Sequence, residues 1–225
     1  MNGKLKTAII LGATGLTGSI LLELLIADQR YNQIKLFSRS AIGFDHPKIT
    51  EYLGDLFHLS DFKEEFMGDE VHCCIGTTRA KTPRKEVYHK IDYGIPVAAA
   101  ALAKENGIGI FLVVSAMGAN PRSPIFYNRT KGQMEASVLL QSIPKTYILR
   151  PSLIAGKRKE KRMGEWLARQ VMKVLHIVLA GPLDKFRSID PLTIAHCMIW
   201  LANNSFENKI IRSDEIRVLG KKYHN

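Results

Sequence analysis

An apolar run that leads straight into three regularly spaced glycines constrains the fold of this chain most strongly. Residues 7–11 are apolar, residues 12–18 read GATGLTG, and residues 19–27 continue with a helical apolar pattern. This order predicts a strand, a glycine turn and the start of a helix. Gly12 permits a sharp turn, Gly15 keeps side chains away from a bound group, and Gly18 lets the helix pack close to the strand.

The same turn predicts a site for a phosphorylated ligand. N–H groups in the first turn of a helix have no partner within the helix, so they bind an anion readily. We expect Thr14, Leu16 and Thr17, together with the three glycines, to hold the pyrophosphate of a dinucleotide cofactor. An ordinary glycine-rich turn is the alternative interpretation.

Length and composition are typical of an ordinary globular protein. The chain has 225 residues, of which 46% are hydrophobic and 24% charged. That length fits one large domain, or a domain with a small appendage. No run of eighteen apolar residues exists, so we expect no transmembrane segment. The three cysteines and seven histidines show no metal-ligand spacing, which predicts structural thiols and no metal site.

The chain carries a formal net charge of +11, which raises the question of nucleic-acid binding. Its densest basic cluster, residues 157–162, has no helix-turn-helix, zinc or aromatic-stacking module beside it. We therefore expect no specific nucleic-acid partner, but attraction of anionic cofactors and substrates. The amino-terminal run meets the glycine turn instead of a cleavage site, which indicates no secretory signal and predicts a cytoplasmic location.

Strand-like and helix-like segments alternate along the first 150 residues. The predicted strands are residues 7–11, 34–38, 49–53, 71–75, 110–115 and 147–150, and the predicted helices are 17–27, 59–66, 86–104 and 130–140. Tyr93 to Pro96 read YGIP and predict a disturbance inside the third of these helices. The alternation predicts an α/β fold with a doubly wound, mostly parallel Rossmann sheet and helices on both faces.

After Arg150 this alternation weakens. Residues 163–179 have an apolar helical stripe, Asp190 and Pro191 are typical of a helix start, and residues 215–219 resemble an edge strand. We interpret residues 1–225 as a single NAD(P)-binding Rossmann-type domain. Within it, residues 151–225 contribute a small substrate-binding region.

The end of the second strand predicts which dinucleotide binds. An acid here would grip the adenosine ribose hydroxyls, but the chain has Ser38 and Arg39 instead. A guanidinium suits a 2′-phosphate, so we expect NADP(H), with NAD(H) as the second choice. Asp55, after the third strand, either accepts a hydrogen bond from the adenine amino group or caps the following helix. Gly76, Thr77 and Thr78 end the fourth strand, where small residues leave room for a cofactor.

A serine, a tyrosine and a lysine predict the chemistry. Ser115 ends the fifth strand, and Tyr127 and Lys131 follow four residues apart, on one face of a helix. A lysine ammonium one turn away favours the phenolate and lowers the pKa of the phenol. Together these residues predict a proton relay for carbonyl reduction or alcohol oxidation. An exposed tyrosine and lysine pair on a solvated helix is the alternative.

With these motifs in place, the chain resembles the short-chain dehydrogenase/reductase superfamily in its atypical, extended-like branch. More closely, it is similar to the Tat-interacting-protein oxidoreductase-like group, over about residues 7–200. The matching pieces are GATGLTG at 12–18, CCIGTTR at 73–79, SAMGA at 115–119, Tyr127 with Lys131, RPS at 150–152 and GEWL at 164–167.

The resemblance implies Ser115 as the polarising serine, Tyr127 as the acid/base, and Lys131 as the residue that also holds the nicotinamide ribose. It implies that Pro151, Ser152 and Leu153 lie against the nicotinamide. Two departures matter. The second serine often found in the family is Ala116 here, and the carboxyl-terminal region is short for a nucleotide-sugar substrate.

These features lead to two functional hypotheses. The first is an NADP(H)-dependent oxidoreductase acting on a small carbonyl or alcohol, with a homodimer as an option. The second is a regulatory protein that senses NADP(H) and binds a protein partner without turnover. Sensors in this branch commonly lack the tyrosine and lysine pair, so its presence favours the enzyme.

Overall fold

Seven strands form one sheet in the order β3-β2-β1-β4-β5-β6-β7, and every pairing within it is parallel. The structure is a computed structural model that describes residues 4–155 and 187–224. The strands are β1 (Lys6–Leu11), β2 (Tyr31–Ser38), β3 (Ile49–Leu53), β4 (Glu70–Cys73), β5 (Ile110–Val114), β6 (Lys145–Arg150) and β7 (Ile210–Arg212). The predicted doubly wound α/β fold is confirmed.

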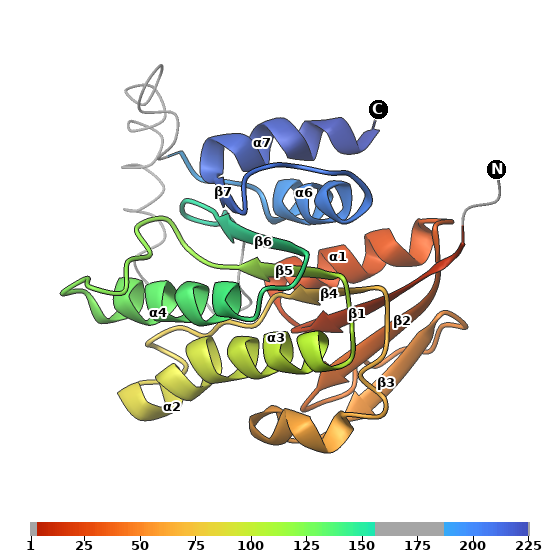
Figure 1. Ribbon diagram of the computed structural model, residues 1–225, viewed down its shortest axis with the longest axis horizontal. Coiled ribbons are helices and arrows are strands. Elements are labelled where there is room, and N and C mark those ends of the chain that lie inside the picture. The colour runs from red at the N-terminus through yellow and green to blue at the C-terminus, as the bar shows by residue number, and fades with distance from the viewer. Residues whose placement is uncertain (1–3, 156–186, 225) are drawn as a thin grey trace.

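Helices cover both faces of this sheet (Figure 1). One face carries α1 (Leu16–Ala27), α6 (Pro191–Asn203) and α7 (Ser213–Lys221), and the other carries α2 (Lys85–His89), α3 (Ile95–Glu105) and α4 (Phe126–Leu140). Short 3₁₀ helices span Leu56–Phe62 and Lys222–His224. Ala8 and Ile10 of β1 pack into the core under α1 and α6, while Ile9 and Leu11 pack into the core under α3 and α4. A strand buried on both sides explains why its sequence is continuously apolar.

A π-helical turn, Lys90–Gly94, separates α2 from α3 and confirms the disturbance predicted near Pro96. The Ile95 N–H donates to the Lys90 carbonyl five residues back, and proline has no N–H to restore the α-helical ladder after it. Asp92 lies in this wider turn and is almost completely buried. Its carboxylate belongs to the site described below.

The carboxyl-terminal end differs from the sequence-based expectation. Residues 215–219, predicted as an edge strand, lie inside α7, so that prediction is wrong; the short strand β7 precedes them. The helix begins where the Glu215 carboxylate accepts a hydrogen bond from the Arg212 N–H at 2.8 Å. Ile216 and Leu219 are then buried on one side of the helix. Their spacing of three residues is that of a helix and not the alternation of a strand. The predicted helix 163–179 and the basic cluster 157–162 lie outside the described residues.

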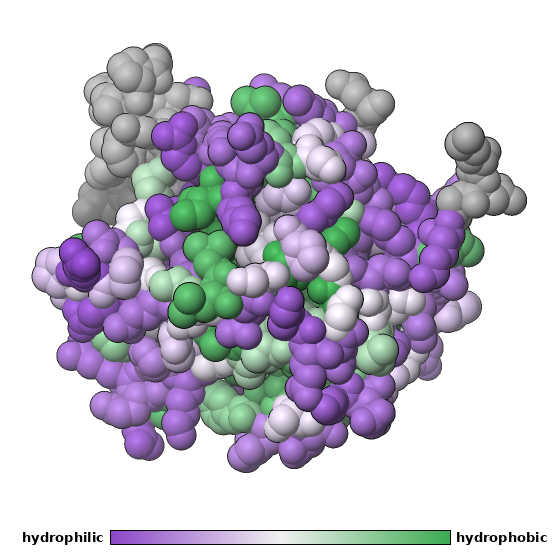
Figure 2. Space-filling model, viewed as in Figure 1, coloured by the Kyte–Doolittle hydropathy of each residue, from purple (hydrophilic) through white to green (hydrophobic). Residues whose placement is uncertain are grey.

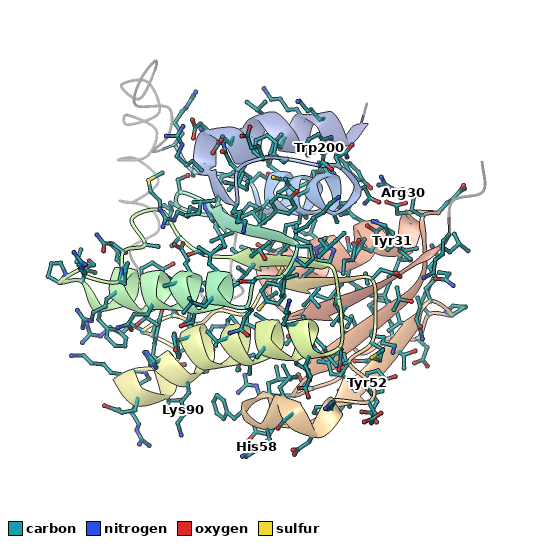
Figure 3. All side chains as sticks on the ribbon, in the orientation of Figure 1. Arg30, Tyr31, Tyr52, His58, Lys90 and Trp200 are labelled. Atoms are coloured by element: carbon teal, nitrogen blue, oxygen red, sulfur yellow. The ribbon has the colours of Figure 1, made fainter. Side chains whose placement is uncertain are left out.

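A buried charge cluster ties the amino ends of the strands to α6. Glu70 accepts hydrogen bonds from the Tyr31 hydroxyl at 2.8 Å and Lys6 at 3.0 Å, and its other contact is His72 Nε2 at 2.8 Å. Asn203 of α6 donates to the same Tyr31 hydroxyl, near the start of β2 (Figure 3). Burial raises the pKa of Glu70, but His72 and then Lys6 outweigh it and hold that pKa below its ordinary value. Glu70 is therefore a buried, charged residue at the amino ends of the strands, and the site lies at their carboxyl ends.

The surface drawn in Figure 2 is mostly hydrophilic, with apolar side chains scattered between polar ones. Within residues 4–155 and 187–224, none of the helices combines the length and the apolar character needed to cross a bilayer.

Candidate functional site

The site lies at the carboxyl ends of the strands, where the strand order reverses. Strand β1 pairs with β2 on one side and with β4 on the other, so the strand order reverses between β1 and β4, where the chain crosses back from β3. Ligands of open α/β sheets bind in the crevice at such a switch point. A cavity of about 840 Å³ opens here, lined by residues that follow β1, β4, β5 and β6.

The glycine turn has the geometry of a close-approach cradle. Gly12 adopts a φ of +88°, and a Cβ at this position would lie 2.9 Å from the Cys74 backbone. A Cβ on Gly18 would lie 2.1 Å from the Gly12 carbonyl oxygen. Gly15 is the N-cap of α1, and no side chain caps this helix. The bare first-turn amides, flanked by Thr14, Leu16 and Thr17, fit a pyrophosphate.

The residues predicted at the adenosine end lie where the strand order places them. Arg39 is exposed directly after β2. The Ser38 hydroxyl is buried and donates to the Ser40 carbonyl at 2.7 Å. Asp55 accepts from the Phe57 N–H at 3.0 Å and so caps the first 3₁₀ helix, which was one of the two alternatives for it. Their contacts to a cofactor remain predictions.

The loop after β4 forms one wall of the cavity. Thr77 and Thr78 line it, and the Thr77 N–H donates to the Asp92 Oδ2 atom at 2.8 Å. A Cβ on Gly76 would lie 3.9 Å from the Lys131 Nζ atom. This loop therefore lies in van der Waals range of the buried Lys131 and Asp92 side chains, with room for a small side chain at Gly76.

The segment after β6 forms the opposite wall. Pro151, Ser152 and Leu153 line the cavity, and their contact with a nicotinamide stays a prediction. The Ser152 hydroxyl donates to the Arg187 carbonyl, and the Ser213 hydroxyl donates to the Ser152 oxygen at 3.0 Å. Ser152 thus fastens the cavity wall to the carboxyl-terminal part of the chain.

Lys131 is buried in an ion pair behind the cavity. Its Nζ atom lies 3.0 Å from Asp92 Oδ1, with side chains only 4% and 1% exposed. This Oδ1 atom has no well-aligned hydrogen bond in the described structure, so the contact is chiefly coulombic. Burial lowers the pKa of Lys131, but Asp92 and then Tyr127 outweigh it and hold that pKa above its ordinary value. Lys131 is therefore a permanent positive charge.

Ser115 is held by a second buried network. Its hydroxyl donates to the Glu135 carboxylate at 2.5 Å, and Glu135 also accepts from the Arg150 guanidinium, at 2.9 Å from Nε. Because this hydroxyl donates to the carboxylate, the serine hydrogen points at Glu135. The lone pairs of Ser115 then remain for a ligand.

Tyr127 lies in the first turn of α4 and lines the cavity with a side chain that is 40% exposed. Lys131 follows one turn later and interacts electrostatically with it. The structure therefore brings the three predicted residues together: Ser115 and Tyr127 face the cavity, and Lys131 lies behind them.

Sequence reasoning missed Asp92 and Glu135. Each is a carboxylate on a helical segment, and Glu135 follows Lys131 by one turn, a spacing that can be read from the sequence. The cysteines agree with the structural interpretation, since the described structure holds them as free thiols. Burial raises the pKa of Cys73 to about 11, which makes it a poor nucleophile.

Solved structures have the same fold. The fold matches MoeE5 in complex with UDP-glucose and NAD with a TM-score of 0.69, at 14% identity over 96% of this chain and 81% of that one. It matches WbmG of Bordetella bronchiseptica in complex with NAD at 0.68, with 13% identity over 99% and 79%. The chain thus has the Rossmann-type α/β fold of these two proteins, each of which was solved with NAD.

Sequence relatives define the family within that fold. FMP52-1 of Scheffersomyces stipitis is 33% identical over 96% of this chain and 98% of its own length. HTATIP2 of Rattus norvegicus is 31% identical over 73% and 69%. The chain belongs to the family that contains FMP52 and HTATIP2, as the resemblance to the Tat-interacting-protein group predicts. No model of a known protein family matches the chain.

The relatives also correct the expected location. Several are named as mitochondrial proteins, including FMP52 of Candida albicans, which is 34% identical over 73% of this chain and 75% of its own length. The cytoplasmic prediction is therefore wrong, and the relatives point to mitochondria. The error arose because lack of a secretory leader says nothing about mitochondrial import, whose signals are amphipathic and Arg-rich.

Proposed function

We propose that the protein is an NADP(H)-dependent oxidoreductase that transfers a hydride between the nicotinamide and a small carbonyl or alcohol. One observation carries this proposal: Ser115 and Tyr127 face a single cavity at the switch point, with the charged Lys131 behind them. Serine, tyrosine and lysine in this arrangement supply a positioned oxygen, a proton donor and a fixed charge.

The chain offers a complete set of contacts for the cofactor. The first turn of α1 would hold the pyrophosphate, Arg39 a 2′-phosphate, and the segment 151–153 the nicotinamide. The bound cofactor supplies the hydride, which no protein side chain can supply. Of the predicted substrate-binding region, the described residues 151–154 line the cavity.

The side chains then divide the remaining chemistry. Tyr127 passes its hydroxyl proton to the substrate oxygen during reduction and regains it from solvent. The Lys131 ammonium stabilises the phenolate that forms, and Asp92 keeps the lysine charged and in place. Because the Ser115 hydrogen is directed at Glu135, its lone pairs would accept a hydrogen bond from the hydroxyl of the alcohol, which is the product of reduction or the substrate of oxidation. This role differs from that of the polarising serine that the resemblance implies, which would donate to a carbonyl oxygen. These contacts position the reacting oxygen next to the tyrosine.

Replacement of the phenol tests the assignment. Tyr127→Phe should lower kcat by roughly 10²- to 10⁴-fold, the usual contribution of a general acid, while NADPH affinity stays nearly constant. Tyr52→Phe is the matched control, because Tyr52 lies on β3, far from α4, and stacks on Phe37 (Figure 3). Turnover of a carbonyl panel is followed by NADPH consumption. Full activity in Tyr127→Phe would refute the acid/base role.

The cofactor preference has its own test. Arg39→Glu removes a charge-assisted contact worth about 1.5–3 kcal/mol, so NADPH should bind roughly 10- to 100-fold more weakly. NADH has no 2′-phosphate, so its affinity should not fall. Unchanged NADPH affinity would refute the preference. Saturable NADPH binding without turnover of any carbonyl would instead favour the NADP(H) sensor.

A further inference from the structure

The lining of the cavity combines cationic and apolar side chains. Its cationic wall consists of Arg79 and Lys81, from the segment between β4 and α2, and of Lys85, the first residue of α2. Its apolar wall consists of five residues. They are Met117, Ile125, Phe126, Leu153 and Ile154. Within the described parts of the chain, no carboxylate lines the cavity.

The apolar wall is exposed in a way that indicates an apolar ligand. Ile125 is 59% exposed and Leu153 is 65% exposed, although both are large aliphatic side chains. Phe126 beside them is fixed by an edge-to-face contact with Tyr88, with ring centroids 5.6 Å apart. Exposed apolar side chains that line a preformed cavity mark a surface that a ligand covers.

The cationic wall meets the apolar wall in one place. The Lys85 ammonium lies 5.9 Å from the centroid of the Phe126 ring, so a positive charge sits at the boundary between them. Arg79 adds a planar fork of donors that matches a carboxylate or phosphate. These cations share the cavity with Ser115 and Tyr127, whereas Arg39 at the adenosine end does not line it. On this ground we assign them to the substrate half of the site, although Leu16, Thr77 and Thr78 of the predicted cofactor side line the same cavity.

Building on the function proposed above, we propose that the substrate is an amphipathic carbonyl compound. It carries the aldehyde or ketone on an apolar body with an anionic group, a carboxylate or a phosphate, at some distance. In reduction, the carbonyl carbon gains a hydride from NADPH, the C=O π electron pair takes the Tyr127 proton, and the alcohol and NADP⁺ result. The anionic group stays intact, and Arg79 and Lys85 bind it.

Three probes test this substrate class: a medium-chain aldehyde ending in a carboxylate, the same aldehyde ending in a phosphate monoester, and the methyl ester of the first. The protein should reduce at least one anionic aldehyde with a kcat/KM more than tenfold above that for the uncharged methyl ester. The preferred anion distinguishes carboxylate from phosphate. Added salt should reduce the advantage, since salt screens the exposed cations.

Charge-removing variants locate the effect. Arg79→Gln and Lys85→Gln should each raise KM for the anionic aldehyde about tenfold and leave KM for the ester and the affinity for NADPH unchanged. Arg84→Gln is the matched control, because Arg84 is exposed in the same segment but does not line the cavity. Equal reduction of acid and ester would overturn the proposal. Loss of NADPH affinity in Arg79→Gln would also overturn it, by assigning the cations to the cofactor.

A binding measurement separates this inference from the oxidoreductase activity. Calorimetry of the NADP⁺-loaded protein should show tighter binding of the medium-chain hydroxy acid than of its methyl ester, and Arg79→Gln should abolish the difference. Charge-selective binding without turnover of any aldehyde would support the anion site and refute the catalytic proposal. Turnover without charge selectivity would support the catalytic proposal and refute the anion site.

Discussion

The Asp92→Asn substitution removes one charge from a buried pair and little else. The amide that replaces the carboxylate would keep an oxygen to accept the Thr77 N–H, so the change isolates the charge opposite Lys131. With both side chains at most 4% exposed, the lysine ammonium would be left uncompensated. Loss of one partner from a buried ion pair costs about 3–5 kcal/mol, a large fraction of the roughly 5–15 kcal/mol that stabilises a typical domain.

Denaturant unfolding measures this cost, and a double variant assigns it. Asp92→Asn and Lys131→Met should each destabilise strongly, whereas the double variant should cost less than their sum by about 1–3 kcal/mol. Glu105→Gln is the control, because it removes a carboxylate from an exposed pair with Lys63 and should leave stability nearly unchanged.

The pH dependence gives a second readout. In the native protein Asp92 holds the pKa of Lys131 above 10.5, so the pair contributes stability below that pH and loses it only at higher pH. In Asp92→Asn the raising effect of Asp92 is lost, and burial, opposed only by smaller effects such as that of Tyr127, lowers the pKa of Lys131; the penalty should therefore shrink as pH rises toward 10.5. A small, pH-independent cost with additive single variants would refute a coupled buried pair.

Further predictions concern the glycine turn, the buried acid and the serine network. Gly18→Ala places a methyl group 2.1 Å from a backbone oxygen, so it should destabilise the protein by about 1–3 kcal/mol and weaken NADPH binding. Gly94→Ala, with open space around it, should leave stability unchanged or raise it. Thermal unfolding compares the two variants, and equal effects would contradict the clash. Because the pKa of Glu70 lies below 4.5, its contribution to stability is complete above that pH and declines as pH falls further. The free energy of unfolding of Glu70→Gln should therefore fall less steeply with decreasing pH than that of the native protein. An unchanged pH dependence would contradict this. Glu135→Gln should lower kcat about tenfold and change NADPH affinity little, because the Ser115 hydroxyl loses its carboxylate acceptor. An unchanged kcat would show that this orientation of Ser115 is dispensable.

The fold was largely predictable because its signals are local. The glycine turn, the strand-to-helix alternation and the Asp190 cap are read within a few residues, and the structure has each of them. The failure at residues 215–219 is also local. Their short apolar pattern suits a strand, and the helical spacing of Ile216 and Leu219 becomes clear only with the Arg212 and Glu215 contact that starts α7.

The site was predictable only in part, because its supporting charges come from distant positions. Ser115, Tyr127 and Lys131 follow from position relative to the fifth strand. The partners do not: Ser115 and Glu135 are 20 residues apart, and the Asp92 carboxylate reaches Lys131 from another helix. Such pairs depend on tertiary packing, which a single sequence does not show.

Isothermal calorimetry with the two pyridine dinucleotides tests the central claim most directly. The bare amides at the start of α1 predict saturable binding of NADPH at one site per chain and weaker affinity for NADH. Gly18→Ala should greatly weaken the binding of both dinucleotides. Absence of heat with either dinucleotide from folded protein would contradict the claim that this turn binds a cofactor.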